Sequence, residues 1–315
     1  MFISNLLDAL GSVPATEVEG PPLPYGQRVE LPGRGTTFVR EIPGPRGAPT
    51  VVLLHGWLAS GGLNWYQVFD ELEPDFRVIA PDLRGHGRGM RTSERFTLAD
   101  CADDVAALLR EMNTGPAIII GYSMGGPVAT LLWKQHPELV AALGLCATGQ
   151  EFLTGNRQRY SMRSATILGA ASLRMGGWAS WLPREMSQRM ITSVAPDRKR
   201  PPTLVRWSQA ELRRHDARMV VEAGTAIASF SSKDWAPTID VPATVMVTEL
   251  DTAVEPLAQR RLARAIPDAR VQRFGDGHLA CINPRFGIAV RKMAVGLAQR
   301  CGLGEPATLG KAATG

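Results

Sequence analysis

The chain has 315 residues, of which 44% are hydrophobic and 21% are charged, with a formal net charge of +5. This composition is ordinary for a soluble globular protein that buries a large core. The four cysteines show no C-x-x-C spacing, which argues against a disulfide framework and favours a reduced interior. The basic residues are distributed and the aromatic residues between them are sparse, so nucleic acid is excluded as a partner.

The first 24 residues are predicted to form an N-terminal extension. Met1 to Leu10 is short, lacks an early positive charge and contains Asp8, so it does not resemble an export signal. Its apolar residues fall on one helical face, for which peripheral contact with a membrane is an alternative, but we expect this face to pack on the domain or fray. Pro14 to Pro24 is rich in proline and is interpreted as an extended linker. We therefore expect a cytoplasmic protein.

Eight short apolar stretches are predicted to form strands, and helical patterns separate most of them. One such helix spans Thr97 to Met112, where Thr97 and Asp100 resemble a capping box. The alternation predicts an α/β fold with an eight-stranded, mostly parallel sheet and helices on both faces. The predicted strands are Arg28–Leu31, Thr37–Ile42, Val51–Leu54, Arg77–Ala80, Ala117–Ile120, Ala142–Cys146, Ala243–Thr248 and Ala269–Phe274.

Histidine and glycine stand together in two loops that follow early strands. His55-Gly56-Trp57 follows the third predicted strand, and Asp82 to Gly87, which includes His86, follows the fourth. A histidine in such a loop more often bonds the backbone than transfers a proton. No histidine stands beside a second histidine or a carboxylate at ligand spacing, so we expect no metal and no cofactor.

The segment Gly121-Tyr122-Ser123-Met124-Gly125 is the most informative motif. It runs from a β-branched strand into the apolar helical pattern of Gly126 to His136, which is the layout of a nucleophile elbow. Gly121 and Gly125 flank Ser123 because larger side chains would collide with the strand and the helix. The Met124 N–H stands at the start of the helix and beside the reacting carbon, where negative charge develops on a substrate oxygen.

A serine nucleophile needs a base, and the base needs an acid that orients it. Asp251 follows the strand Ala243–Thr248, and His278 follows the last predicted strand. The order Ser123, Asp251, His278 is the one expected for this kind of elbow. Asp276 is a rival acid, but it stands too close to His278 in sequence and is expected to form loop hydrogen bonds.

Together these motifs resemble the α/β-hydrolase superfamily, in its lidded branch of esterases and non-haem peroxidases. The resemblance implies a Ser123 nucleophile, a His278 base, an Asp251 orienter, and an oxyanion hole formed by the backbone N–H groups of Trp57 and Met124. Gly56 belongs to the loop that carries Trp57. The epoxide hydrolases and dehalogenases of this branch have aspartate at the elbow, and Ser123 instead favours acyl transfer.

The region from 150 to 235 breaks the strand and helix alternation and is predicted to be a helical cap, or lid. It holds 14 Lys and Arg against 7 Asp and Glu, so the basic charge is concentrated there. An anionic substrate or weak peripheral association with an anionic membrane surface would explain this charge, and so would a solvated face without a partner. His215 is assigned to such a solvated helix face. Apolar residues in 166–182 are expected to be core or to roof an acyl pocket.

The predicted organisation is an extension over 1–24, a core over 25–149 and 236–301, the cap over 150–235 and a flexible tail over 302–315. The predicted function is cleavage of carboxylic esters with small to medium apolar acyl groups through an acyl-enzyme. Thioesterase, lactonase, carbon–carbon hydrolase and perhydrolase activities use the same triad and stay open. A non-enzymatic alternative is a protein that binds a small hydrophobic ligand. The expected partner is a small ester or acyl substrate, and nothing in the sequence specifies an oligomeric state.

Overall fold

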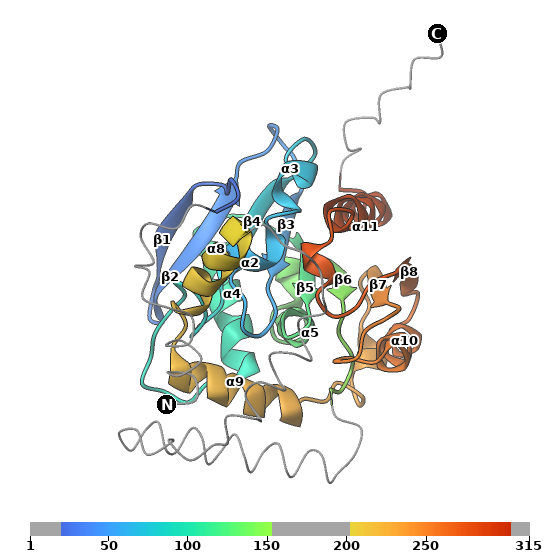
Figure 1. The fold of residues 1–315 in the computed structure, drawn as a ribbon. Helices are drawn as coiled ribbons and strands as arrows, with labels where there is room; N and C mark the ends of the chain where they lie inside the picture. The colour runs from blue at the N-terminus through green and yellow to red at the C-terminus, as the bar shows by residue number, and fades with distance from the viewer. Residues whose placement is uncertain (1–19, 153–201, 304–315) are drawn as a thin grey trace.

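The structure is a computed structural model that describes residues 20–152 and 202–303. Within these ranges eight strands form one sheet in the order β1-β2-β4-β3-β5-β6-β7-β8 (Figure 1). The strands are β1 (Gly26–Leu31), β2 (Gly35–Ile42), β3 (Thr50–Leu54), β4 (Arg77–Asp82), β5 (Ala117–Tyr122), β6 (Val140–Cys146), β7 (Ala243–Thr248) and β8 (Arg270–Phe274). The prediction of an eight-stranded α/β fold is confirmed.

The sheet is antiparallel at one edge and parallel elsewhere. Strand β2 pairs antiparallel with both β1 and β4, whereas β4, β3, β5, β6, β7 and β8 pair in parallel. The register sets Leu54 opposite Gly121 and Tyr122 opposite Cys146. Because the parallel strands run in the same direction, their carboxyl ends lie together. The loops that follow β3, β5, β7 and β8 therefore all begin at this end of the strands.

Helices cover both faces of this sheet. Figure 1 shows α11 on the opposite side of the sheet from α4, α5 and α9. The bounds are α2 (Gly61–Trp65), α3 (Phe69–Leu72), α4 (Leu98–Glu111), α5 (Gly125–Gln135), η1 (Pro137–Leu139), α8 (Pro202–Leu212), α9 (Ala217–Ser229), η2 (Ala236–Thr238), α10 (Pro256–Ala265), η3 (Ala280–Ile282) and α11 (Phe286–Cys301). Helix α4 begins as predicted, since the Thr97 side chain accepts a hydrogen bond from the Asp100 N–H.

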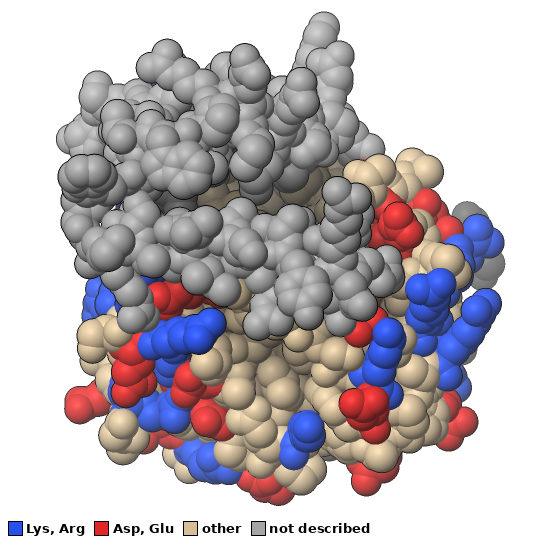
Figure 2. All heavy atoms as spheres, turned by 90° about the horizontal axis from the view of Figure 1, so that it is seen from below, with Lys and Arg blue, Asp and Glu red and all other residues tan. Residues whose placement is uncertain are grey.

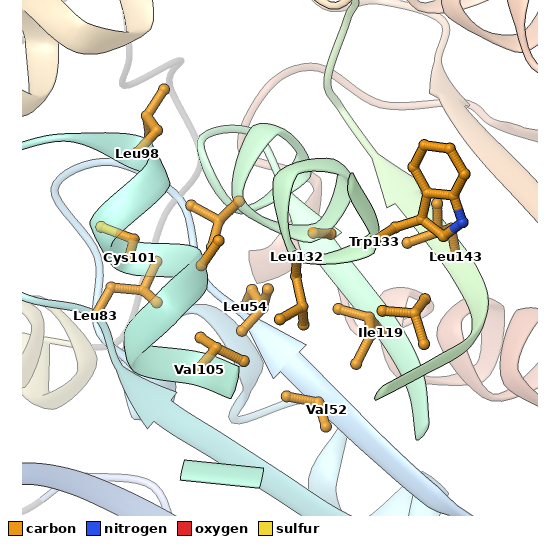
Figure 3. Packing of buried hydrophobic residues seen from close by; sticks show 14 of the residues in the cluster. Val52, Leu54, Leu83, Leu98, Cys101, Val105, Ile119, Leu132, Trp133 and Leu143 are labelled. Atoms are coloured by element: carbon orange, nitrogen blue, oxygen red, sulfur yellow. The ribbon is translucent and has the colours of Figure 1, made fainter. Parts of the chain in front are cut away.

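The core consists of two layers, one on each face of the sheet. Alternation along β5 sends Ile119 into one layer and Ile118 and Ile120 into the other. In the first layer, side chains of α4 and α5 meet those of β3 and β5 (Figure 3). In the second, α11 packs against the sheet through side chains such as Phe286. A central strand buried on both faces explains the continuous isoleucine run.

Only part of the predicted cap falls within the described residues, namely 150–152 and 202–235, which contain α8 and α9. Most of the predicted extension and tail, and the apolar stretch 166–182, lie outside them. None of the helices described is long and apolar enough to cross a membrane. The domain bounds of the sequence analysis stay predictions.

Acidic and basic side chains alternate on one face of the described molecule. Figure 2 shows Lys and Arg beside Asp and Glu there, with uncharged surface between them. Nine of the 14 Lys and Arg counted in the predicted cap fall in 153–201, outside the described residues. The association of a basic cap with an anionic membrane therefore stays a prediction.

Candidate active site

The loop between β5 and α5 carries Ser123 in a strained backbone conformation. Its φ is 50°, in the left-handed region that non-glycine residues rarely adopt. A Cβ atom at Gly121 would lie 2.2 Å from the Gly125 carbonyl oxygen, and one at Gly125 would lie 2.1 Å from the Leu54 carbonyl oxygen. Both positions therefore require glycine, for the steric reason that the motif implied. The Ser123 N–H donates to the Cys146 carbonyl oxygen, at 2.9 Å, and this bond fixes the turn against β6.

The structure brings together the three residues that the sequence analysis selected. The Oγ of Ser123 lies 3.0 Å from Nε2 of His278, and Nδ1 of His278 lies 2.8 Å from Oδ2 of Asp251. Ser123 and Asp251 are buried, whereas the His278 side chain is 23% exposed. Because a carboxylate only accepts, the Asp251 contact assigns the imidazole proton to Nδ1 and leaves Nε2 free to accept the serine proton.

Asp251 is held by a ring of donors in addition to His278. Its oxygens accept hydrogen bonds from the Thr248 hydroxyl, the Gln259 amide, and the backbone N–H groups of Ala253 and Val254. Gln259 also donates to the Thr248 hydroxyl and to the Val254 carbonyl, so it ties the acid loop to α10. No role was predicted from the sequence for Thr248 or Gln259, although both stand within eight residues of Asp251.

Asp276 takes part in local loop structure. Its carboxylate accepts from the Gly277 N–H at 2.8 Å and from the Asn283 side chain at 2.7 Å. These are the loop hydrogen bonds expected of it.

The two candidate oxyanion donors stand in the loop that carries Ser123 and in the loop after β3. Met124 is the N-cap residue of α5, directly after Ser123. Gly56 lies against the serine, since a Cβ there would be 3.3 Å from the Ser123 Cβ, and Trp57 follows it. The Gly56 N–H already donates to Oδ1 of Asn64, at 2.9 Å. Among the described residues no acceptor takes the N–H of Trp57 or Met124.

The hydroxyl of Tyr122 connects the elbow to the histidine loop. It donates to the His278 carbonyl oxygen at 2.5 Å and accepts from the Cys281 N–H. Burial raises the pKa of Tyr122 well above its usual value, so the phenol stays protonated and keeps its donor. No role was predicted from the sequence for Tyr122, the second residue of the motif.

Three histidines outside the triad form a cluster in which His55 and His86 are fully buried and His215 is partly buried. The ring centroids of His55 and His86 are 5.4 Å apart, and those of His86 and His215 are 5.3 Å apart. Burial lowers the pKa of His55 to about 3 and that of His215 to about 4, and it also lowers the pKa of His86. The rings are therefore neutral and bond the backbone: His55 accepts from the Leu83 N–H, and the Nδ1 of His86 lies 3.0 Å from the Arg84 carbonyl oxygen.

The assignment of His215 to a solvated helix face is wrong. This residue lies between α8 and α9, is partly buried, and accepts a hydrogen bond from the Gly87 N–H at 2.8 Å. Its neighbours in sequence are charged, but the chain turns the ring toward the core loop that contains His86. The charged residues around His215 favoured a solvated helix face, and the spacing of residues in the sequence does not reveal its contact with Gly87.

The remaining polar residues of the early loops stabilise structure. Asp82 accepts from the N–H groups of Gly61 and Arg88, and Arg84 binds Asp104 through two hydrogen bonds. All four cysteines are free. Within 20–152 and 202–303 no group of three or more His, Cys, Asp or Glu residues is arranged to hold a metal ion.

Comparisons with known proteins agree with this fold. A family model described as "alpha/beta hydrolase fold" matches residues 49–284, a range that includes Ser123, Asp251 and His278. The chain is 31% identical over 228 residues to the pimeloyl-[acyl-carrier protein] methyl ester esterase of Chromobacterium violaceum, which covers 72% of this chain and 85% of that protein.

Two solved structures show the same arrangement of the chain. A thermophilic esterase from Thermogutta terrifontis superposes with a TM-score of 0.68 at 26% identity, over 84% of this chain and 97% of that one. An esterase from Exiguobacterium antarcticum superposes with a TM-score of 0.70 over the same shares, and at 19% identity it supports the fold alone.

Proposed function

The chain belongs to the α/β-hydrolase family, and from this premise we propose that it is a serine hydrolase that cleaves carboxylic esters with small to medium apolar acyl groups. The observation that carries the proposal is the continuous hydrogen-bonded series from Ser123 through His278 to Asp251. A relative named as a methyl ester esterase supports the ester as the bond that is cleaved.

The proposed reaction begins with attack of the Ser123 oxygen on the ester carbonyl. His278 takes the serine proton at Nε2, and Asp251 stabilises the imidazolium through the Nδ1 hydrogen bond. The N–H groups of Trp57 and Met124 donate to the oxyanion of the tetrahedral intermediate, which is the position where negative charge develops.

Collapse of that intermediate expels the alcohol, which receives the proton from Nε2 of His278, and leaves the acyl group on Ser123. Water then attacks the acyl-enzyme while His278 again removes a proton. The second tetrahedral intermediate releases the carboxylic acid and restores the Ser123 hydroxyl. The strained φ of Ser123 serves this chemistry by holding the nucleophile at the turn between strand and helix.

The test is active-site labelling and turnover by wild type, Ser123→Ala and Ser93→Ala. Ser93 is an exposed serine in the loop before α4, so its variant is the matched control. A fluorophosphonate probe should label wild type and Ser93→Ala but not Ser123→Ala, and p-nitrophenyl butyrate hydrolysis should disappear with the label. We expect a loss of at least about 10³-fold, which is typical for removal of a triad nucleophile.

The substrate class is tested with p-nitrophenyl esters from acetate to decanoate. Activity that peaks at medium acyl length supports the proposal, and turnover of acetate alone contradicts it. Parallel assays with thioesters, lactones and added hydrogen peroxide measure the alternative activities of the same triad. Tight ligand binding that is unchanged in Ser123→Ala, with negligible turnover by wild type, would identify a binding protein instead.

A further inference from the structure

The side chain of Trp57 leaves its own loop and docks on α9. Its indole Nε1 donates to the Val220 carbonyl oxygen at 2.8 Å. The ring lies against Gly224, where an added Cβ would be 3.0 Å from Cζ2 and 3.4 Å from Cη2. Val220 and Gly224 are one helical turn apart and therefore share a face of α9. One hydrogen bond and one close contact thus fix the indole on the helix.

Hydrogen bonds hold the backbone that leads into Trp57. The Gly56 N–H donates to Asn64, and the Gly56 carbonyl oxygen lies 2.8 Å from Nδ1 of His55. Leu58 has a φ of 58°, a strained value for this residue type, so its loop needs such contacts to keep its shape.

Helix α9 is anchored to the core near this loop. The Asp216 N–H, at the N-cap, donates to the Gly85 carbonyl oxygen at 2.8 Å. The Phe96 N–H donates to the Glu222 carboxylate at 2.8 Å. Met219 and Ala223 are fully buried in the core layer that α4 and α5 also form. The helix therefore provides a rigid support for the indole.

We propose that α9 positions the oxyanion-hole amide of Trp57, with Val220 and Gly224 as positioning residues. This inference rests on the proposed function, because it assigns the Trp57 N–H to the oxyanion. An oxyanion donor acts only within about 2.7–3.1 Å of the developing charge, and a misplacement of about 1 Å can cost about 100-fold in rate. Residues of the predicted cap thereby control the geometry of the transition state and not only access to the site.

The test compares Gly224→Ala with Gly296→Ala in the full-length protein. Gly296 is a helical glycine of α11 where an added Cβ meets nothing within 4 Å, so it is the matched control. Alanine favours helix over glycine at both positions, and a loss of activity at 224 cannot come from weakened helix propensity. The methyl group at 224 should instead displace the Trp57 ring and its loop.

We expect Gly224→Ala to lower kcat for p-nitrophenyl butyrate about 10- to 100-fold while KM changes less than about threefold. Affinity for a boronic acid that mimics the tetrahedral intermediate should fall by the same factor as kcat/KM. Trp57→Phe keeps an aromatic ring but removes the Nε1 donor, and a smaller loss of the same kind is expected. This second variant decides the matter if Gly224→Ala does not fold.

Hydrogen exchange provides a readout that does not depend on activity. The Gly56 amide, which donates to Asn64, should exchange faster in Gly224→Ala than in wild type or Gly296→Ala. Unchanged exchange and unchanged kcat in both Trp57→Phe and Gly224→Ala would overturn the inference. An effect on KM alone would also overturn it, because α9 would then only line the substrate-binding site. Failure of the proposed function is distinguishable, because it appears as Ser123-independent turnover or as no turnover in wild type.

Discussion

Tyr122 shows how one hydroxyl can couple a nucleophile to its base. The ring is buried, with 3% exposure, beside the Trp65 and Phe286 rings. Its hydroxyl donates to the carbonyl oxygen of His278, and the next residue in the chain is Ser123. The elbow and the histidine loop therefore share a contact at the backbone of the base, in addition to the contact between Ser123 and His278 side chains.

We expect Tyr122→Phe to lower kcat by up to about tenfold with little change in KM, because a lost buried hydrogen bond corresponds to about 1 kcal/mol and leaves the His278 carbonyl without this donor. Steady-state kinetics with p-nitrophenyl butyrate measure kcat and KM separately. The free energy of unfolding in urea should fall by about 1–2 kcal/mol.

Tyr25→Phe is the control for this prediction, since Tyr25 is 81% exposed. Its kinetics and its unfolding should match those of wild type. A Tyr122→Phe enzyme with wild-type kcat would show that the His278 loop holds its position without the phenol.

At the scale of elements, α8 is joined to the core by a buried carboxylate. Glu211 accepts two hydrogen bonds from Arg88 at 2.9 and 2.8 Å and one from the Ser60 hydroxyl at 3.1 Å. Burial opposes its ionisation, but the Arg88 contacts outweigh it and the pKa of Glu211 is lowered. Ser60 also caps α2, so this ion pair joins α8, α2 and the loop after β4.

We expect Glu211→Gln to reduce the free energy of unfolding by about 1–3 kcal/mol, because it leaves the half-buried Arg88 without its charge partner. Urea unfolding followed by circular dichroism measures the change. The matched control is Glu138→Gln, which breaks the exposed pair with Arg110 and should cost less than about 1 kcal/mol. Equal losses in the two variants would contradict the buried role of Glu211.

At the scale of the whole molecule, the cluster of His55, His86 and His215 makes stability depend on pH. Burial lowers these pKa values in the folded state, to about 3 for His55 and about 4 for His215, whereas an unfolded histidine has a pKa near 6.5. The unfolded chain therefore binds more protons at mildly acidic pH. The stabilisation is complete above about pH 6.5 and is lost progressively as the pH falls toward 4.

For each histidine that stays neutral in the folded state, the free energy of unfolding should fall by about 1.4 kcal/mol for every pH unit that the pH is lowered in this window. His215→Asn keeps an acceptor for the Gly87 N–H but does not titrate, so its stability should fall less steeply with acid by about that amount. Urea unfolding of both proteins at several pH values between about 4.5 and 7.5 measures the two slopes. Parallel slopes would show that His215 does not take up a proton on unfolding.

The strands, the elbow and the fold class could be predicted from local sequence patterns. Burial of Ile118 to Ile120 on both faces, the capping of α4 by Thr97, and the glycine requirement at 121 and 125 are local consequences of side-chain shape and spacing. Such features depend on residues a few positions apart, and a linear pattern records them.

The tertiary structure decided which distant groups meet. Ser123 and His278 are 155 positions apart, and they meet because the parallel strands that precede them have their carboxyl ends together. Trp57 and Val220 are 163 positions apart, and they meet because α9 packs over the loop after β3. The ordered motifs pointed to the first contact, but no periodicity encodes the second, nor the cluster of His86 and His215. Their positions follow from packing between segments remote in sequence, which local propensity does not specify.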